Sequence, residues 1–361
     1  MDAVAVAQVL SEIGYLLRQN EAERFRAKAF AAAAWSVVLS RPDLEALQKT
    51  NALTTIDGVG PGIAKVLAGL IETGQSTYLD RLRAETGQPA RDDESQIDLS
   101  RYRGDVHSHT KWSDGKATML EMAQGAQAMH YQYLGITDHS PRITVVHGLS
   151  AERLLEQSRE MADVQLKVEG LTLLQGIEVD ILEDGALDLP DAVLELLDIV
   201  IASPHVKLRQ ESAAMTERML RAVSNPHVHV IGHPTGRRPG SRPGADYDFE
   251  LVFKEAAKNN VALEIDCDPA RMDLSPEMAR LALECGCNFT MDADAHAPVE
   301  FAYVPMAAWM ARRAGIPQER ILNFLDLDEL TAALHRGDAA PRPGTPRPAT
   351  PRPPRRPPRA R

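Results

Sequence analysis

The stretch GDVHSHTKWSDG, residues 104–115, contains two histidines one residue apart at the end of a short apolar run. Alternate residues of a strand face the same side, so His107 and His109 could both point the same way as ligands. Asp114 follows five residues later. Imidazole and carboxylate groups together bind zinc, manganese or iron. A single histidine is more often a hydrogen-bonded structural residue, so the metal hypothesis depends on what lies elsewhere in the chain.

Similar residue types end the other short apolar runs of the chain. They are His139 in ITDHS, Glu178 in GIEVD, His205 in ASPH, His233 in IGHP, and Asp294 with His296 in DADAH, while the run VALEID ends in Asp266. The three residues of the first stretch and the six from His139 to His296 make nine candidate ligands. Nine ligands exceed what one four- to six-coordinate ion can use, so two or three metal ions are predicted. Clustered divalent ions neutralise phosphate oxygens and activate water, and the predicted chemistry is therefore phosphoester hydrolysis.

The elements that must position these groups are short β-rich runs separated by longer helical stretches. This alternation predicts βαβ units and a parallel sheet, either open or closed into a barrel, and hence an α/β fold. Seven strands over roughly 230 residues fit a TIM-like barrel. Such barrels gather the C-terminal ends of their strands around one mouth, where we expect the candidate ligands to converge.

The chain outside this region has a different pattern at each end. Residues 1–87 show apolar positions at three- and four-residue spacing and are predicted to form a small all-α domain. A polar linker over residues 88–101 would join it to the barrel at 102–337. Residues 338–361 are rich in proline and arginine and are predicted to form a disordered tail, which could add salt-dependent attraction to phosphate.

Composition limits the function classes. The net charge of −11 argues against a surface that is basic throughout, so any contact with a polyanion must be local. The 3 cysteines suit a reducing cytosol better than a disulfide framework. No secretory signal is evident, and the most apolar run, residues 29–39, is about half the roughly 20 residues that a bilayer requires. We expect a cytoplasmic protein without a membrane partner; the sequence does not indicate its oligomeric state.

The motifs HSH with SDG, TDHS, GIEVDIL, ASPH, GHPTGR and DADAH occur in the order found in the PHP (polymerase and histidinol phosphatase) domain, and this resemblance covers roughly residues 102–335. It implies a distorted (βα)7 barrel that carries three divalent metal ions, zinc or manganese, with iron also possible. The resemblance implies one ion bound by His107, His109, Glu178 and Asp294, a second by Glu178, His205 and His233, and a third by Asp114, His139 and His296. Arg237, together with Lys207 or Arg209, could hold phosphate oxygens, although a solvated cation is an equal alternative for each.

The stretch TTIDGVGPGIAKVL, residues 54–67, resembles a helix-hairpin-helix motif. Gly58 and Gly60 would form its tight turn, Gly62 would open the next helix, and Lys65 would lie in that helix. Such a turn presents backbone N–H groups to DNA phosphate without reading bases.

With the stretches that flank this motif, residues 1–87 resemble the N-terminal 8 kDa domain of bacterial family X DNA polymerases, whose C-terminal part is a PHP domain. A short linker stands where such polymerases carry their catalytic core, so no polymerase activity is expected. The lysine that supports lyase activity in that family falls on Val66, which argues against lyase activity here.

Together these features imply a metal-dependent hydrolase that acts on DNA, a 3′-5′ exonuclease or 3′ end-processing enzyme of DNA repair. The alternative is a small-molecule phosphatase of the histidinol phosphatase type, in which the helical domain serves packing or assembly. A DNA-binding protein with structural metals is a third class, but closed structural sites do not need nine ligands on six loops.

Overall fold

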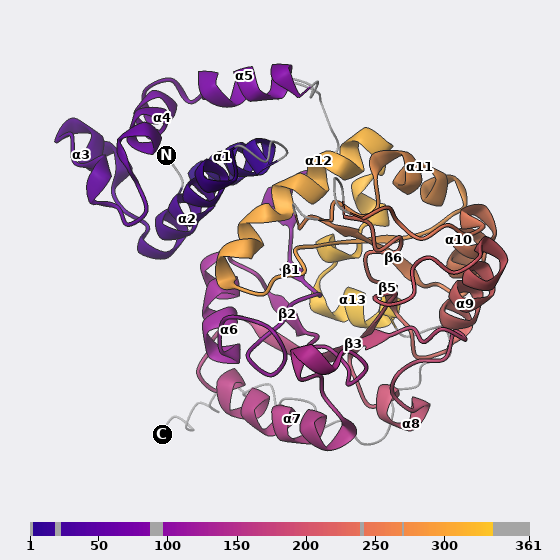
Figure 1. The fold of residues 1–361 in the computed structure, drawn as a ribbon. Coiled ribbons are helices and arrows are strands. Elements are labelled where there is room, and N and C mark those ends of the chain that lie inside the picture. Colours follow the sequence, from indigo (N-terminus) through magenta and orange to yellow (C-terminus); the bar gives the residue numbers. More distant parts are fainter. Residues whose placement is uncertain (1–2, 19–22, 87–96, 239–241, 269–270, 335–361) are drawn as a thin grey trace, which may run out of the picture.

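The structure is a computed structural model that describes residues 3–18, 23–86, 97–238, 242–268 and 271–334 (Figure 1). The predicted tail and most of the predicted linker lie outside these ranges. Seven strands form one sheet in chain order, and every neighbouring pair is parallel: β1 (Gly104–Asp105), β2 (Tyr133–Ile136), β3 (Thr172–Asp180), β4 (Ile199–Ser203), β5 (Val230–Ile231), β6 (Ala262–Asp266) and β7 (Phe289–Asp292). The predicted α/β class and seven-stranded parallel barrel are confirmed.

Helices surround the sheet, and the helices of the N-terminal segment lie to one side of the barrel (Figure 1). Those around the barrel are α6 (Met119–Ala128), α7 (Ala151–Gln165), α8 (Asp191–Leu194), α9 (Ser212–Ser224), α10 (Phe249–Lys258), α11 (Pro276–Glu284), α12 (Val304–Ala314) and α13 (Leu327–Leu334). The N-terminal helices are α1 (Ala3–Arg18), α2 (Arg24–Ser40), α3 (Leu44–Lys49), α4 (Pro61–Thr73) and α5 (Thr77–Glu85). Across the described ranges, no helix is both long and apolar enough to cross a membrane.

The first and last strands approach each other just beyond their ends. A parallel bridge joins Ser108 to Ala295, and the His109 N–H donates to the Ala295 carbonyl at 2.8 Å. This contact closes the sheet into a barrel at the end where the strands finish. It also places the two i, i+2 ligand pairs that the sequence singled out on adjacent stretches of chain.

Two buried carboxylates complete this seam by taking the place of ladder carbonyls. Asp292 accepts a hydrogen bond from the Val106 N–H at 2.9 Å, and Asp105 accepts one from the Ala293 N–H at 2.9 Å. Asn323 also donates to Asp292 at 2.9 Å. Burial raises the pKa of both carboxyl groups. These bonds satisfy backbone donors that the short β1 strand would otherwise leave unpaired inside the protein.

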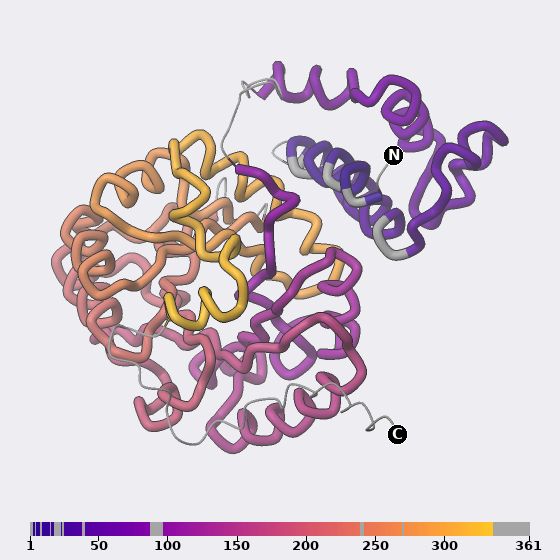
Figure 2. Tube along the Cα trace, turned by 180° about the vertical axis from the view of Figure 1, so that it is seen from behind, coloured from indigo at the N-terminus to yellow at the C-terminus, as the bar shows by residue number. Residues whose placement is uncertain are grey.

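The N-terminal end of the barrel is filled by apolar side chains. Those pointing inward from the strands include Val106, Ile199, Ile201 and Val230, and they form one cluster with Leu330 of α13. Figure 2 shows the segment with α13 crossing the back of the barrel. The opposite end is therefore left for polar groups.

The helices α1 and α2 pack directly against the barrel, on α12 and on the 3-10 helix at Pro298–Tyr303. Arg41, just after α2, donates from Nη2 to the Ala128 carbonyl at 2.8 Å. Within the helical segment, Arg83 makes two hydrogen bonds to Glu12, at 2.5 and 2.7 Å. Buried residues of α1, α2 and α12 belong to one continuous apolar cluster. The helical segment therefore shares its core with the outer wall of the barrel.

We expect Asp292→Ala to destabilise the protein by roughly 1–3 kcal/mol, because it leaves the buried Val106 N–H without an acceptor and removes one of the acceptors of the Asn323 amide. Urea unfolding in the presence of EDTA measures this effect without a contribution from metal binding. Asp184→Ala is the control, since Asp184 is exposed and should not change the unfolding midpoint. Equal midpoints for the two variants would contradict the role of Asp292 in closing the barrel.

Candidate metal centre

The nine predicted ligands gather at the C-terminal ends of the strands. His107 and His109 follow β1, His139 follows β2, Glu178 lies in β3, His205 and His233 follow β4 and β5, Asp294 and His296 follow β7, and Asp114 lies in the loop between β1 and α6. Because a parallel barrel brings all these ends to one mouth, residues nearly 190 positions apart become neighbours.

Glu178 lies at the middle of this assembly and is 1% exposed. Its Oε1 is 2.8 Å from Nε2 of His233, 3.2 Å from Nε2 of His205 and 3.6 Å from Nε2 of His107. Its Oε2 is 2.7 Å from Nδ1 of His139. One carboxylate thus touches side chains from four other loops, an arrangement suited to bridging two cations.

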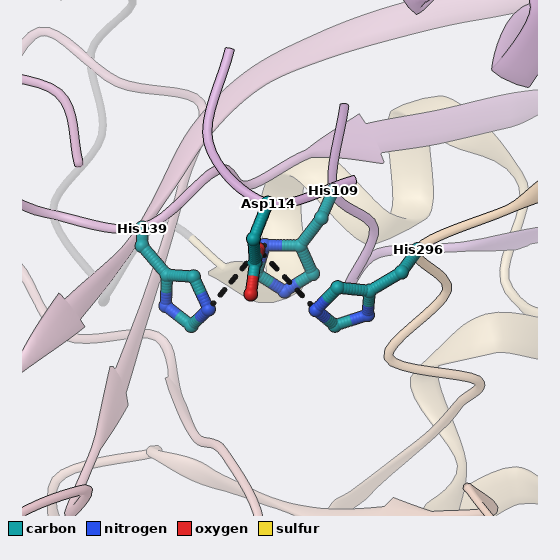
Figure 3. Close-up of side chains that lie close together, drawn as sticks. All are labelled: His109, Asp114, His139 and His296. Carbon is teal, nitrogen blue, oxygen red and sulfur yellow. Dashed lines mark ion pairs between the residues drawn. The ribbon is translucent and has the colours of Figure 1, made fainter. Parts of the chain in front are cut away.

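A second group of side chains, His109, His139 and His296, surrounds Asp114 (Figure 3). Its Oδ1 is 3.5 Å from Nε2 of His139, 3.4 Å from Nε2 of His296 and 4.0 Å from Nδ1 of His109. The side chains of Asp114 and His296 are 33% and 24% exposed, whereas His107 and His109 are fully buried. Solvent and substrate therefore reach the centre most directly on the Asp114 side.

Three overlapping sets of side chains have ligand atoms close enough to hold an ion: His109 with Asp114, His139 and His296; His107 with His109 and Asp294; and His139 with Glu178 and His205. They differ from the sets implied by the family resemblance in three respects, the first being that Glu178 does not belong to the set of His107, His109 and Asp294. His109 belongs to two sets, because its ring stacks on that of His296 with centroids 4.3 Å apart. His139 lies beside Glu178, while His233 contacts Glu178 but falls in none of the three sets.

Several buried ring nitrogens have no hydrogen-bond partner among the described residues. Both nitrogens of His109 and both of His205 are in this state, as is Nε2 of His107. Leaving buried polar atoms unpaired costs about 1–3 kcal/mol each, so native proteins seldom retain them without a function. These nitrogens lie near carboxylates but form no hydrogen bond with them. A divalent cation between them would bind both groups, so the residues present fit a metal centre.

The surroundings of the centre shift the pKa values of its histidines in opposite directions. Burial, followed by the nearby His296 and His139, lowers the pKa of His109 to about 3. For His139, burial alone would lower the pKa, but the carboxylates of Glu178 and Asp114 together outweigh burial and raise the pKa to about 10. Metal binding requires a neutral imidazole, so His109 is already in the ligand form and His139 would release a proton.

Backbone conformation is unusual at the points where the loops leave the strands. His233, Asp294 and Lys207 have positive φ angles of 27°, 46° and 54°. Residues other than glycine rarely adopt this left-handed backbone conformation, and such strain clusters at functional sites. The turn lets the chain leave a strand while His233 and Asp294 keep pointing into the mouth.

Two buried residues of the centre were missed by sequence reasoning. Glu264 accepts from the His233 N–H at 2.5 Å, and its other oxygen lies 2.6 Å from Nδ1 of His107, which fixes the orientation of that ring. Arg271 donates from Nε to Asp294 at 3.1 Å. Glu264 could have been found from strand alternation, because it lies two residues before Asp266 on the same face of β6. Arg271 lies in a loop, and the sequence gives no comparable signal for it.

The two predicted phosphate-binding cations lie in different environments. Arg237 donates from Nε to the Arg271 carbonyl at 3.3 Å and from Nη2 to the Met272 carbonyl, so its guanidinium is bound to the main chain. Lys207 is exposed and lies two residues after His205. The roles of both in phosphate binding stay predictions.

The predicted DNA-binding residues lie in the turn between α3 and α4. Gly58 has a φ angle of 72°, a conformation that glycine adopts freely. Gly60 is the residue before α4, Gly62 lies in the first turn of that helix, and Lys65 is exposed on it. Gly62, which follows Pro61 at the start of α4, is exposed, and no described side chain caps this end of the helix.

Comparison with known proteins identifies the family. The model of the PHP domain matches residues 105–268. The DNA polymerase/3'-5' exonuclease PolX of Bacillus subtilis is 39% identical over 242 residues, which are 67% of this chain but 42% of that protein. A probable phosphatase of Clostridium botulinum is 30% identical over 232 residues, 62% of this chain and 90% of the relative. The crystal structure of a Lactococcus lactis histidinol phosphate phosphatase complexed with zinc, histidinol and phosphate superposes with a TM-score of 0.43 and 15% identity, covering 59% of this chain and 94% of that one. The chain belongs to the PHP domain family of metal-dependent phosphoesterases.

Proposed function

We propose that the protein is a cytoplasmic phosphoesterase that acts on the 3′ end of DNA, as a 3′-5′ exonuclease or end-processing enzyme in DNA repair. The observation that carries the proposal is the gathering of nine imidazole and carboxylate groups around Glu178, with buried ring nitrogens that lack partners within the described ranges. In this proposal residues 1–87 form the DNA-binding unit, 88–101 a linker, 102–337 the catalytic barrel and 338–361 a disordered tail.

The nine side chains would hold three divalent ions, zinc or manganese. When bound, these ions would neutralise phosphate oxygens and supply an activated water. The residues of the chain have separate tasks: Glu264 orients the ring of His107, and Arg271 keeps a positive charge against Asp294. Asp114 and His296 form the accessible edge, where an incoming phosphate would first meet the centre.

Two features favour DNA as the substrate. No side chain caps the described start of α4, and Lys65 is exposed on that helix, which suits a phosphate backbone. The Bacillus subtilis relative is named as a 3'-5' exonuclease, although the chain matches only 42% of its length. A small-molecule phosphatase is the second candidate, because the Clostridium relative is named a probable phosphatase and is matched over 90% of its length.

We expect Glu178→Gln to lose metal, because the amide removes the charge that five histidine rings surround. Elemental analysis of the purified protein should show at least one fewer ion per chain, and the remaining sites should bind more than 10-fold more weakly. Glu183→Gln, an exposed glutamate paired with Arg142, is the matched control. Full metal content in the Glu178 variant would exclude it as a bridging ligand.

Incubation with manganese and 5′-labelled DNA should shorten the strand from its 3′ end, or remove a 3′-phosphate, and EDTA should stop the reaction. Gel electrophoresis of the products over time measures this. Histidinol phosphate and nucleoside monophosphates are tested in parallel. Hydrolysis of these small esters while the DNA stays intact would replace the DNA proposal with the phosphatase alternative.

Lys65→Ala should weaken DNA binding severalfold at low salt. It should also reduce the slope of affinity against salt concentration by the amount expected for about one phosphate contact. Fluorescence anisotropy with labelled DNA in EDTA measures binding without cleavage. Lys254→Ala is the control, since that exposed lysine lies on α10 of the barrel. If both variants bind as the wild type does over a range of salt concentrations, the turn does not contact DNA through Lys65.

A further inference from the structure

A pocket of about 550 Å³ lies beside the Asp114 group. It is formed by the loop after β1 and the loop after β2, and its walls include Lys111, Trp112, Thr144, His147 and Arg153. Asp114 directly follows the wall residue Ser113, and His139 lies two residues before the wall residue Pro141. The pocket and the open edge of the metal centre are therefore built from the same two loops.

Asp138 fixes these loops to each other. It accepts hydrogen bonds from the Thr110 N–H at 2.8 Å, the Ser113 N–H at 3.1 Å and the Ser113 hydroxyl at 2.5 Å. Asp138 precedes His139, so the wall of the pocket has a set position relative to a candidate ligand. A molecule held in the pocket would be positioned with respect to the metal centre.

Trp112 is held rigidly in the wall of this pocket. Its indole N–H donates to Glu160 at 2.8 Å, and its carbonyl accepts from Arg153 Nη2 at 2.7 Å. The guanidinium of Arg153 also lies 5.4 Å from the centre of the indole ring and donates to the Gly148 carbonyl at 3.0 Å. An aromatic ring fixed in this way loses little conformational freedom when a ligand stacks on it.

The lining selects the chemistry of the ligand. Among the described residues that form the wall, the charged side chains are cationic and no carboxylate is present. A flat aromatic ring joined to an anionic group matches these walls, and the volume is in the range of small-molecule sites.

We infer that this pocket binds the base of the terminal nucleotide while the phosphate of that nucleotide lies at the Asp114 edge of the metal centre. The inference rests on the proposed function and deepens it, because it assigns Trp112 to stacking on the base. Stacking of this kind tolerates every base, so the pocket would recognise a nucleotide without reading sequence.

The test compares two 5′-phosphonate analogues that cannot be hydrolysed: one of deoxyadenosine and one of the same sugar without a base. Their affinities for the manganese-loaded, full-length protein are measured by calorimetry. Trp112→Ala should weaken binding of the base-bearing analogue roughly 5- to 100-fold and leave the base-free analogue within twofold. Trp112→Phe should retain most of the affinity, since it keeps an aromatic face. Trp309→Phe on α12 is the control and should bind both analogues as the wild type does.

Equal affinity of the wild type for the two analogues would overturn the inference, and so would an equal effect of Trp112→Ala on both. These outcomes are separate from failure of the DNA proposal, because binding is measured without hydrolysis. A protein that prefers the base-bearing analogue through Trp112 but leaves DNA ends intact would keep the nucleotide pocket and lose the exonuclease activity.

Discussion

The metal centre depends on the closure of the barrel between its first and last strands. β1 has only two residues, so few ladder bonds can hold it against β7. The carboxylates of Asp105 and Asp292 make the missing bonds from their side chains. Because closure is achieved there, the chain that carries His107 and His109 runs beside the chain that carries Asp294 and His296. An open sheet with the same strands would leave these pairs at opposite edges.

The layers of the barrel interior explain why polar groups collect at only one end. Apolar side chains fill the N-terminal part of the barrel interior, and small residues follow toward the C-terminal ends of the strands. Gly232 is one of these, since a Cβ there would lie 2.3 Å from the Ser203 hydroxyl and 3.5 Å from Glu264. A side chain at this position would displace the Ser203 hydroxyl. Carboxylates and imidazoles packed at this density repel as well as attract one another, and bound cations would balance them.

Much of this arrangement could be predicted from the sequence, because the ligands follow strands and parallel strands end at one mouth. The seven strands and the gathering of nine side chains follow from that rule. The grouping of His109 with Asp114 could not be derived, since it depends on how two rings stack across the mouth. Arg271 was missed because loops have no periodicity, and the engagement of Arg237 with carbonyls depends on a turn that residue types do not specify. The packing of α1 and α2 on the barrel was also hidden, because an apolar helix face does not say what covers it.

The apolar floor beneath the strands, completed by Leu330 of α13, determines how molecules travel to and from the centre. Water and ions have no favourable path through such a tightly packed hydrocarbon layer. The ester substrate and its products must then pass through the same opening, at the C-terminal ends of the strands. Product released by one turnover would occupy the route that the next substrate must take, so accumulated product would inhibit the enzyme.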